Sequence, residues 1–273
     1  MNPFDNIKQQ IDKDLHSKLP KKWKKIGNVL VADFSQIDTI DLSHVSEIYA
    51  AVLKVKTVMQ KNRVNGELRR PERTEILFGH DTETEITEYG LKYKMDLSKT
   101  MWSPGNTGWR AVLDGPDKVS SFYDFESPNV IIDYFAGIGY FSIQLAKSYP
   151  NAKIISIDKN ATSTEYLVKN LKINNITNVE VINDDCRNIK LRSDVIHLGY
   201  ISNTLEFLEH AYSNLNENGI AVFHEAYNNS WLGFNKRSDW EAYLRNLISL
   251  WTKMALQLKN LIELNFMVQV KAM

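Results

Sequence analysis

The sequence of 273 residues contains a single cysteine, Cys186. One thiol cannot form a disulfide within the chain, which excludes the disulfide-stabilised secreted domains and fits a reducing compartment. Long apolar runs are also absent, because no stretch approaches the roughly 20 apolar residues that cross a bilayer. Residues Met1 to Lys25 are polar and charged and lack the apolar centre of a signal peptide. We therefore expect a cytoplasmic protein with no membrane partner.

An excess of charge of either sign is missing as well, since 33 Lys and Arg residues balance 33 Asp and Glu residues. Net charge gives no sign of nucleic-acid binding, so an RNA-binding surface would have to be a local patch. Two clusters qualify, and an ordinary solvated surface is the simpler alternative for each. Their basic residues include Lys22, Lys24 and Lys25 in the first cluster and Arg63, Arg69, Arg70 and Arg73 in the second.

Apolar residues are plentiful enough, at 43%, to fill a core. A chain of this length is long for one domain and suits two. The turn cluster Asp114-Gly-Pro-Asp117 can join them. We place a small α+β domain at residues 1–115, beginning with a polar N-terminal arm that contacts RNA together with the rest of the domain. The second domain takes residues 116–273.

The first domain combines strand and helix patterns. Val29–Phe34 is apolar and β-branched at its start, which predicts a strand, whereas the apolar spacing over Val45–Gln60 predicts a helix. Three further short segments separated by glycine and aspartate predict antiparallel strands and hairpins. These segments are Glu75–Phe78, Glu85–Thr87 and Leu91–Met95.

The second domain alternates strictly between strand and helix. This alternation predicts an α/β fold with a doubly wound, mostly parallel sheet and helices on both faces. Ligands bind such sheets at the carboxyl ends of the strands, near the switch in strand order. The expected strands are Val130–Phe135, Lys153–Asp158, Val179–Asn183, Asp194–Leu198 and Gly219–His224, with helices over Tyr140–Ser148, 161–173, 204–215 and 239–258.

A glycine-containing turn follows the first of these strands, in Asp133-Tyr-Phe-Ala-Gly-Ile-Gly139. Gly137 and Gly139 lack the side chains that would keep a ligand away from the backbone, and they permit unusual dihedral angles. Glycines in a turn between strand and helix also occur for purely structural reasons. The dinucleotide-binding pattern Gly-x-Gly-x-x-Gly is incomplete, because position 142 is Ser.

Acidic residues mark three strand ends. Asp158 follows the second strand, where a carboxylate can accept hydrogen bonds from both hydroxyls of a ribose. Asn183-Asp-Asp-Cys186 follows the third strand, where a carboxylate and a backbone amide can read an adenine edge. Asp133 can orient the glycine turn or hold the amino group of a methionine moiety. Together they suit adenosine with a cationic sulfonium, so we predict a class I S-adenosylmethionine-dependent methyltransferase fold.

The end of the fourth strand bears on the type of reaction. Amino-group methyltransferases often carry an Asn/Asp-Pro-Pro-Tyr-like motif there, and this chain has His197-Leu-Gly-Tyr200. His197 could act as a general base or be a half-buried structural histidine. Cys186 is expected to be a packing residue, because the sequence shows no partner that would activate a cysteine nucleophile.

These segments, with several others, resemble the archaeal and eukaryotic family of tRNA-modifying enzymes that act at position 37, beside the anticodon. The resemblance runs from about Ala50 to Ala272. It depends on Val64–Glu72, Asp96–Asn106, Asp133–Ser142, Asp158–Asn160 and Asn183–Arg187.

The family contains guanine N1-methyltransferases and the aminocarboxypropyl transferases of wybutosine synthesis. Three details are similar to the second branch. His197-Leu-Gly199 resembles its fourth strand end, where methyltransferases look like Asn-x-Pro, and Trp102-Ser-Pro-Gly-Asn106 stands where methyltransferases tend to have Ser-Pro-Arg. His224-Glu225 is similar to a His-Glu pair of that branch, although a polar pair at an ordinary strand end would look the same.

The resemblance implies transfer of the 3-amino-3-carboxypropyl group of S-adenosylmethionine to a tricyclic guanosine derivative at position 37 of tRNA-Phe, with release of methylthioadenosine. The anticodon loop would open so that the target base enters the pocket. A guanine-37 N1-methyltransferase is the first alternative, and a tRNA-binding module without activity is the second.

The resemblance and the strand ends together define the expected site. Trp102, with Ser103 and Asn106, is expected to cap the cofactor, although Trp102 could simply pack between the domains. No metal site is assigned, and the oligomeric state stays open. The catalytic candidates are His197 and Glu225, and the expected cofactor-binding residues are Trp102, Ser103, Asn106, Asp133, Phe135, Ala136, Gly137, Gly139, Tyr140, Phe141, Asp158, Lys159, Asp184, Asp185, Cys186, Leu198 and Gly199.

Overall fold

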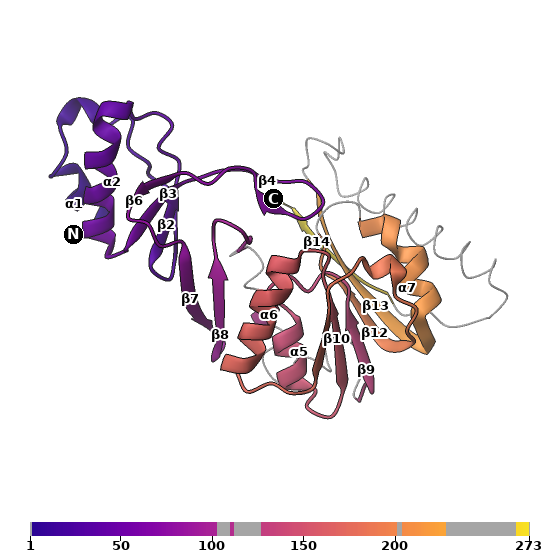
Figure 1. Ribbon diagram of the computed structural model, residues 1–273. Helices are drawn as coiled ribbons and strands as arrows, with labels where there is room; N and C mark the ends of the chain where they lie inside the picture. The colour runs from indigo at the N-terminus through magenta and orange to yellow at the C-terminus, as the bar shows by residue number, and fades with distance from the viewer. Residues whose placement is uncertain (1, 103–109, 112–126, 201–203, 228–265, 273) are drawn as a thin grey trace. The chain divides into compact units, whose positions relative to one another are not determined.

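The computed structural model describes residues 2–102, 110–111, 127–200, 204–227 and 266–272. The chain forms two compact units, Met1–Thr107 and Gly108–Met273 (Figure 1). The domain boundary expected after residue 115 and the helix expected over 239–258 lie outside the described residues.

The first unit contains a four-stranded sheet in the order β1-β2-β3-β6. β2 and β3 are parallel and joined through the helix α2, whereas the outer strands pair antiparallel. The helix expected over Val45–Gln60 is wrong in its bounds. The chain leaves the helix at Lys54, which has a left-handed φ of 52°, and the next apolar residues pair as β3 instead. The elements are β1 (Trp23–Ile26), β2 (Val29–Ala32), α2 (Thr39–Leu53), β3 (Thr57–Gln60) and β6 (Ile76–Phe78).

The N-terminal segment is part of this unit and not the polar arm that the sequence suggested. It forms the helix α1 (Pro3–Lys8) and the 3-10 turn η1 (Lys13–Leu15), and α1 packs against α2. The few apolar side chains of the segment lie at intervals that bring them all into the core. These buried side chains are Ile7, Ile11, Leu15 and Leu19.

Tyr49 lies at the centre of this core with no exposed surface. Its ring meets Phe34 and Trp23 edge-on, at centroid distances of 5.1 and 6.0 Å. The hydroxyl donates a 2.7 Å hydrogen bond to the backbone carbonyl of Pro20, and burial raises the pKa of Tyr49 above its ordinary value. A single side chain therefore connects α2 with the segment that leads into β1.

Two hairpins complete the first unit; the second was expected from the segments Glu85–Thr87 and Leu91–Met95, and the first was not expected. The first pairs β4 (Val64–Asn65) with β5 (Arg70–Pro71), and the second pairs β7 (Glu83–Glu88) with β8 (Leu91–Asp96).

The second unit contains a six-stranded sheet in the order β11-β10-β9-β12-β13-β14, in which all neighbours are parallel. The chain starts in the middle at β9, moves outward to β11 and crosses back to β12 on the other side of β9. This is the doubly wound α/β arrangement that the strand and helix alternation predicted. The strands are β9 (Val130–Asp133), β10 (Lys153–Ile157), β11 (Val179–Ile182), β12 (Ser193–Leu198), β13 (Leu215–Tyr227) and β14 (Phe266–Ala272).

Helices cover both faces of this sheet. The first face packs α5 (Ser142–Ser148) against strand residues that include Ile131 and Val195. The second face packs α7 (Leu208–Asn214) against Ile132, Ile196 and others. Because side chains alternate along a strand, the residues at 131, 133, 195 and 197 share the α5 face.

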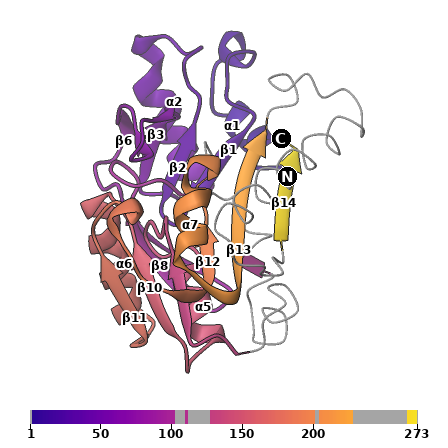
Figure 2. The ribbon, with the colours of Figure 1, turned by 90° about the vertical axis from the view of Figure 1, so that its right-hand side faces the viewer.

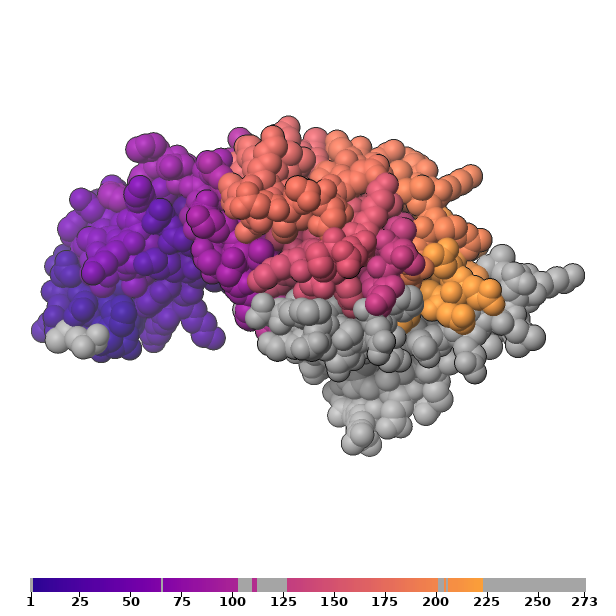
Figure 3. Space-filling view, turned by 90° about the horizontal axis from the view of Figure 1, so that it is seen from below, coloured from indigo at the N-terminus to yellow at the C-terminus, as the bar shows by residue number. Residues whose placement is uncertain are grey.

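The remaining elements also connect the strands. α6 (Ala161–Ile173) has the bounds expected, whereas the helix expected over 204–215 is divided into the 3-10 turn η4 (Thr204–Phe207) and α7. Figure 2 shows α7 lying over β12 and β13, and β14 running beside β13. In the space-filling view, the pink surface of residues near 130–150 adjoins the salmon surface of the residues that follow in the chain (Figure 3). In the described part of the chain, no helix combines the length and apolar character that a membrane span needs.

Replacing Tyr49 with phenylalanine tests the packing of the first unit. The Tyr49→Phe variant keeps the ring but leaves the buried carbonyl of Pro20 without its donor, so we expect stability to fall by about 1–3 kcal/mol. Hydrogen exchange followed by mass spectrometry should show faster exchange in α2 and β2, with β9 and β12 of the other unit as internal control. Unchanged protection in α2 would contradict the role given to this hydrogen bond.

Candidate functional site

The candidate site lies where β9, β10, β11 and β12 end at one edge of the second unit's sheet. β9 pairs in parallel with β10 on one side and with β12 on the other. The chain leaves β9 for β10 and returns to β12, so the switch in strand order falls at this edge. Parallel α/β sheets bind ligands at such a switch. The acidic strand ends expected from the sequence are thus brought together.

Gly137 and Gly139 form a turn that no other residue type would fit. Both have left-handed φ angles, of 56° and 100°. A Cβ on Gly137 would lie 2.4 Å from the Tyr140 ring, and one on Gly139 would lie 2.6 and 2.7 Å from the side chains of Ile143 and Leu167. The second glycine therefore allows α6, which carries Leu167, to pack closely against the turn.

Asp133, the last residue of β9, has no exposed surface. Its Oδ2 accepts a 2.6 Å hydrogen bond from the Ser142 hydroxyl at the start of α5. Its Oδ1 accepts a 3.4 Å hydrogen bond from the backbone N–H of Phe135 and lies 3.5 Å from Nδ1 of His197. Of the two roles expected for Asp133, this geometry favours orientation of the glycine turn over direct contact with a ligand.

Asp158, just after β10, is held by the backbone on both sides. Its Oδ2 accepts a 2.7 Å hydrogen bond from the N–H of Gly137, and its Oδ1 accepts a 2.8 Å hydrogen bond from the N–H of Asn160. Burial, with repulsion from Asp133 as a smaller cause, raises the pKa of Asp158 to about 6. A carboxylate oxygen has two acceptor positions, so each oxygen can still accept from one hydroxyl of a ribose.

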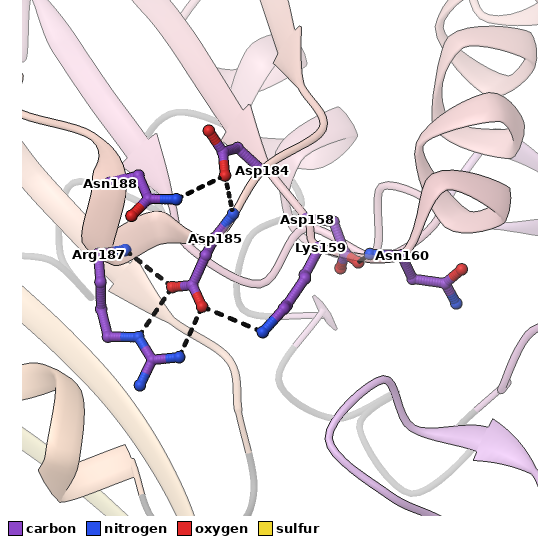
Figure 4. Close-up of polar contacts among 7 residues, drawn as sticks. All are labelled: Asp158, Lys159, Asn160, Asp184, Asp185, Arg187 and Asn188. Carbon is purple, nitrogen blue, oxygen red and sulfur yellow. Dashed lines mark hydrogen bonds and ion pairs between the residues drawn. The ribbon is translucent and has the colours of Figure 1, made fainter.

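Asp185, after β11, is the centre of an ion cluster (Figure 4). The guanidinium of Arg187 donates to both carboxylate oxygens, at 2.9 and 2.6 Å, and Lys159 approaches Oδ2 at 3.3 Å. The hydrogen bonds from Arg187 hold the pKa of Asp185 well below its usual range. Asp184 instead accepts from the N–H of Asp185 and from Asn188.

This cluster changes the interpretation of the acidic segment. The sequence suggested that Asp184 or Asp185 reads an adenine edge, and Lys159 was counted as a cofactor contact. In the structure, the carboxylate of Asp185 bonds both Lys159 and Arg187, and the sequence reasoning missed Arg187. Asp184 is exposed beside them and keeps acceptor capacity.

Cys186 and Leu198 are buried in the core on the α7 face. Burial raises the pKa of the Cys186 thiol to about 12, so the thiol stays protonated near neutral pH. The expectation that Cys186 is a packing residue is confirmed. Since both side chains point into the core, only the backbone atoms of these two residues could meet a ligand.

An aromatic cluster lies beside the site and includes residues that the sequence reasoning did not assign. The Phe135 ring is stacked on Tyr200 at 4.8 Å, and Phe207 meets Phe135 edge-on at the same distance. The guanidinium of Arg187 lies 5.1 Å from the Phe207 ring. The sequence signal that could have indicated this cluster was Tyr200, the last residue of the segment His197-Leu-Gly-Tyr200 at the fourth strand end.

The other expected residues are only partly described. Trp102 is buried in the first unit, 5.5 Å from the Tyr93 ring, whereas Ser103 and Asn106 lie outside the described residues. Glu225 lies on β13, in register with Val270 of β14, and its side chain is also outside the described part. No group of three or more potential metal ligands occurs among the residues that the structure describes.

The tight packing at Gly139 gives a stability prediction. The Gly139→Ala variant combines a strained positive φ with a Cβ inside contact distance of Ile143 and Leu167, so we expect a loss of at least about 2 kcal/mol. Gly66→Ala is the matched control, because Gly66 also has a positive φ but no atom within 4 Å of the added Cβ. Urea unfolding followed by circular dichroism compares the two; equal losses would contradict close packing at Gly139.

The sequence and the fold of this chain match known proteins. Residues 84–239 match the TRM5/TYW2 methyltransferase domain, and residues 4–82 match the TYW2 N-terminal domain. The resemblance thus begins well before Ala50, where the sequence analysis placed its start.

Among curated relatives, the tRNA(Phe) (4-demethylwyosine(37)-C(7)) aminocarboxypropyltransferase of Pyrococcus horikoshii is 34% identical over 224 residues, covering 80% of this chain and 76% of that protein. The tRNA (guanine(37)-N(1))-methyltransferase Trm5b of Pyrococcus abyssi is 30% identical over 220 residues, covering 78% of this chain and 62% of that protein.

A solved structure of Pyrococcus horikoshii TYW2 in complex with MeSAdo superposes with a TM-score of 0.67 at 28% identity. The superposition covers 89% of this chain and 88% of that one. The methyltransferase fold expected from the strand ends is therefore confirmed. On the matched domains and the identity over most of its length, the chain belongs to the TRM5/TYW2 family.

Proposed function

We propose that this chain transfers the 3-amino-3-carboxypropyl group of S-adenosylmethionine to a tricyclic guanosine derivative at position 37 of tRNA-Phe, releasing methylthioadenosine. The observation that carries the proposal is the end of β12, where the chain has His197-Leu-Gly199 and not the Asn-x-Pro segment typical of the methyltransferase branch. The relative of that activity is also more similar than Trm5b, at 34% against 30% identity.

The residues at the strand ends fit this cofactor. Asp158 offers acceptor positions for a ribose beside the glycine turn, whose Gly137 N–H it accepts. The carboxylates of Asp133 and Asp158 also lie close enough to influence each other, which gives the site a negative potential suited to a cation. When bound, S-adenosylmethionine supplies a sulfonium with three electrophilic carbons, and the product depends on which carbon faces the base.

The protein's part in this reaction is to bind and orient. Asp158 and the glycine turn would hold the adenosine end, and the half-buried rings of Phe135 and Tyr200 would offer an apolar surface at the same edge. The contributions of Trp102, Ser103 and Asn106 to the methionine end, and of Glu225 to catalysis, stay predictions.

The tRNA is expected to meet exposed basic residues of the first unit. Lys22 and Lys24 are exposed, and Lys25 donates to the carbonyl of Leu53 at the end of α2. Arg63, Arg69, Arg70 and Arg73 lie on or next to the hairpin of β4 and β5. Neutralisation of phosphates by such residues would make binding salt-dependent. Recognition of the anticodon loop and a cytoplasmic location belong to the same proposal.

A guanine-37 N1-methyltransferase is the second candidate, because the matched domain and the similarity to Trm5b are shared with that activity. The two reactions release different nucleosides, which separates them chemically.

The by-product of the reaction tests the proposal directly. Incubation with S-adenosylmethionine and tRNA from a strain blocked before this step should release methylthioadenosine and add the aminocarboxypropyl mass to the tRNA, both read by mass spectrometry. Release of S-adenosylhomocysteine would move the chain to the methyltransferase branch. Absence of either product, with the cofactor bound, would support a binding module without activity.

The raised pKa of Asp158 predicts pH-dependent cofactor binding. Above pH 6 the carboxylate is ionised and accepts strong hydrogen bonds from ribose hydroxyls, whereas protonation at lower pH removes its charge. We expect calorimetry to show about tenfold weaker binding of S-adenosylmethionine at pH 5 than at pH 7.5. Asp158→Asn should bind weakly at both pH values, and a persistent pH dependence in that variant would refute the assignment.

A further inference from the structure

His197 and Asp133 form a buried pair between the two strands at the switch in strand order. They are direct register partners on β12 and β9, and neither has any exposed surface. Both side chains lie on the α5 face of the sheet, where Nδ1 of His197 is 3.5 Å from Oδ1 of Asp133. The ring can therefore donate to the carboxylate through Nδ1.

The ring of His197 is held in this direction by its neighbours. Its centroid lies 4.3 Å from that of Phe141, which precedes α5. Gly199 leaves room for the ring, because a Cβ there would come within 3.3 Å of Cε1 of His197 and 3.5 Å of the Phe141 ring. Leu198 points the other way, into the core on the α7 face. Phe141 and Gly199 thus fix the ring of His197 on the α5 face, whereas Leu198 packs on the other face.

This arrangement does not suit a general base. A base has to come within hydrogen-bond distance of the substrate proton, directly or through one water. A ring without exposed surface, packed between Asp133 and Phe141, does not offer Nε2 to a substrate at the edge of the sheet.

We propose that His197 is a positioning residue that acts through Nδ1 on Asp133 and thereby fixes the glycine turn that holds the cofactor. Asp133 bonds the N–H of Phe135 and the hydroxyl of Ser142 at the two ends of that turn, so its orientation sets the course of the backbone between them. The role rests on the proposed binding of S-adenosylmethionine. The proposal adds that the His-Leu-Gly segment contributes to cofactor affinity and does not transfer a proton.

Three substitutions of His197 separate the possible roles. Asparagine places an amide nitrogen where Nδ1 was, glutamine places one near Nε2, and leucine keeps bulk without a donor. The affinity for S-adenosylmethionine is measured by calorimetry on the full chain, with circular dichroism to check folding. We expect His197→Asn to bind within about threefold of the unsubstituted protein, and His197→Gln and His197→Leu to bind about tenfold or more weakly, as for the loss of a buried hydrogen bond.

Two results would overturn the proposal. Unchanged affinity of His197→Leu would show that the ring only packs. Normal affinity with lost turnover in all three variants would show that Nε2 acts as a base after all. If His197→Leu does not fold, His197→Gln decides between these outcomes, because it also lacks a donor at the position of Nδ1. An unsubstituted protein that fails to bind the cofactor would instead count against the proposed function.

Discussion

The carboxylate of Asp133 joins the glycine turn and the start of α5 to β12, which is distant in the sequence. It lies fully buried at the end of β9, bonds the backbone of the following turn and the first residue of α5, and faces His197 on β12. A buried carboxylate is stable only where hydrogen-bond donors surround it, so these groups have to stay in place together. These bonds hold the turn that contains Gly137 and Gly139 at both of its ends.

Two carboxylates at this edge of the sheet, those of Asp158 and Asp185, have different roles. Asp158 is held by backbone N–H groups and keeps acceptor positions toward the edge, whereas Asp185 is neutralised by Arg187 and Lys159. Burial raises the pKa of the first carboxyl, and hydrogen bonds from Arg187 lower the pKa of the second. One acidic residue is thus suited to a ligand, and the other stabilises the loop after β11. In this account Arg187, lying over Phe207, also connects that loop to the aromatic cluster.

Sequence periodicity and residue type predicted the second unit well, because a strict alternation of strand and helix allows few arrangements. The strand order and the direction of each side chain were not predictable. From the sequence Asp185 was expected to bind a ligand, but in the folded loop it bonds Arg187. Ser142 was noted only as the missing third glycine of the dinucleotide pattern, but its hydroxyl bonds Asp133. In the first unit, Ile7 and Leu19 are too widely spaced among polar residues to reveal a buried segment, so the polar arm was a wrong prediction. Each of these cases depends on where the folded backbone places the side chains, which residue type and spacing do not give.

Hydrogen exchange of the glycine turn tests most directly whether Asp133 holds the site in shape. The measurement compares the ligand-free protein with Asp133→Asn, which keeps the size of the side chain but removes its charge and one acceptor. The account predicts exchange about tenfold or more faster across residues 135–143 in the variant, with protection in the core of β11 and α6 retained. Equal protection of the turn in both proteins would show that its conformation does not depend on this carboxylate.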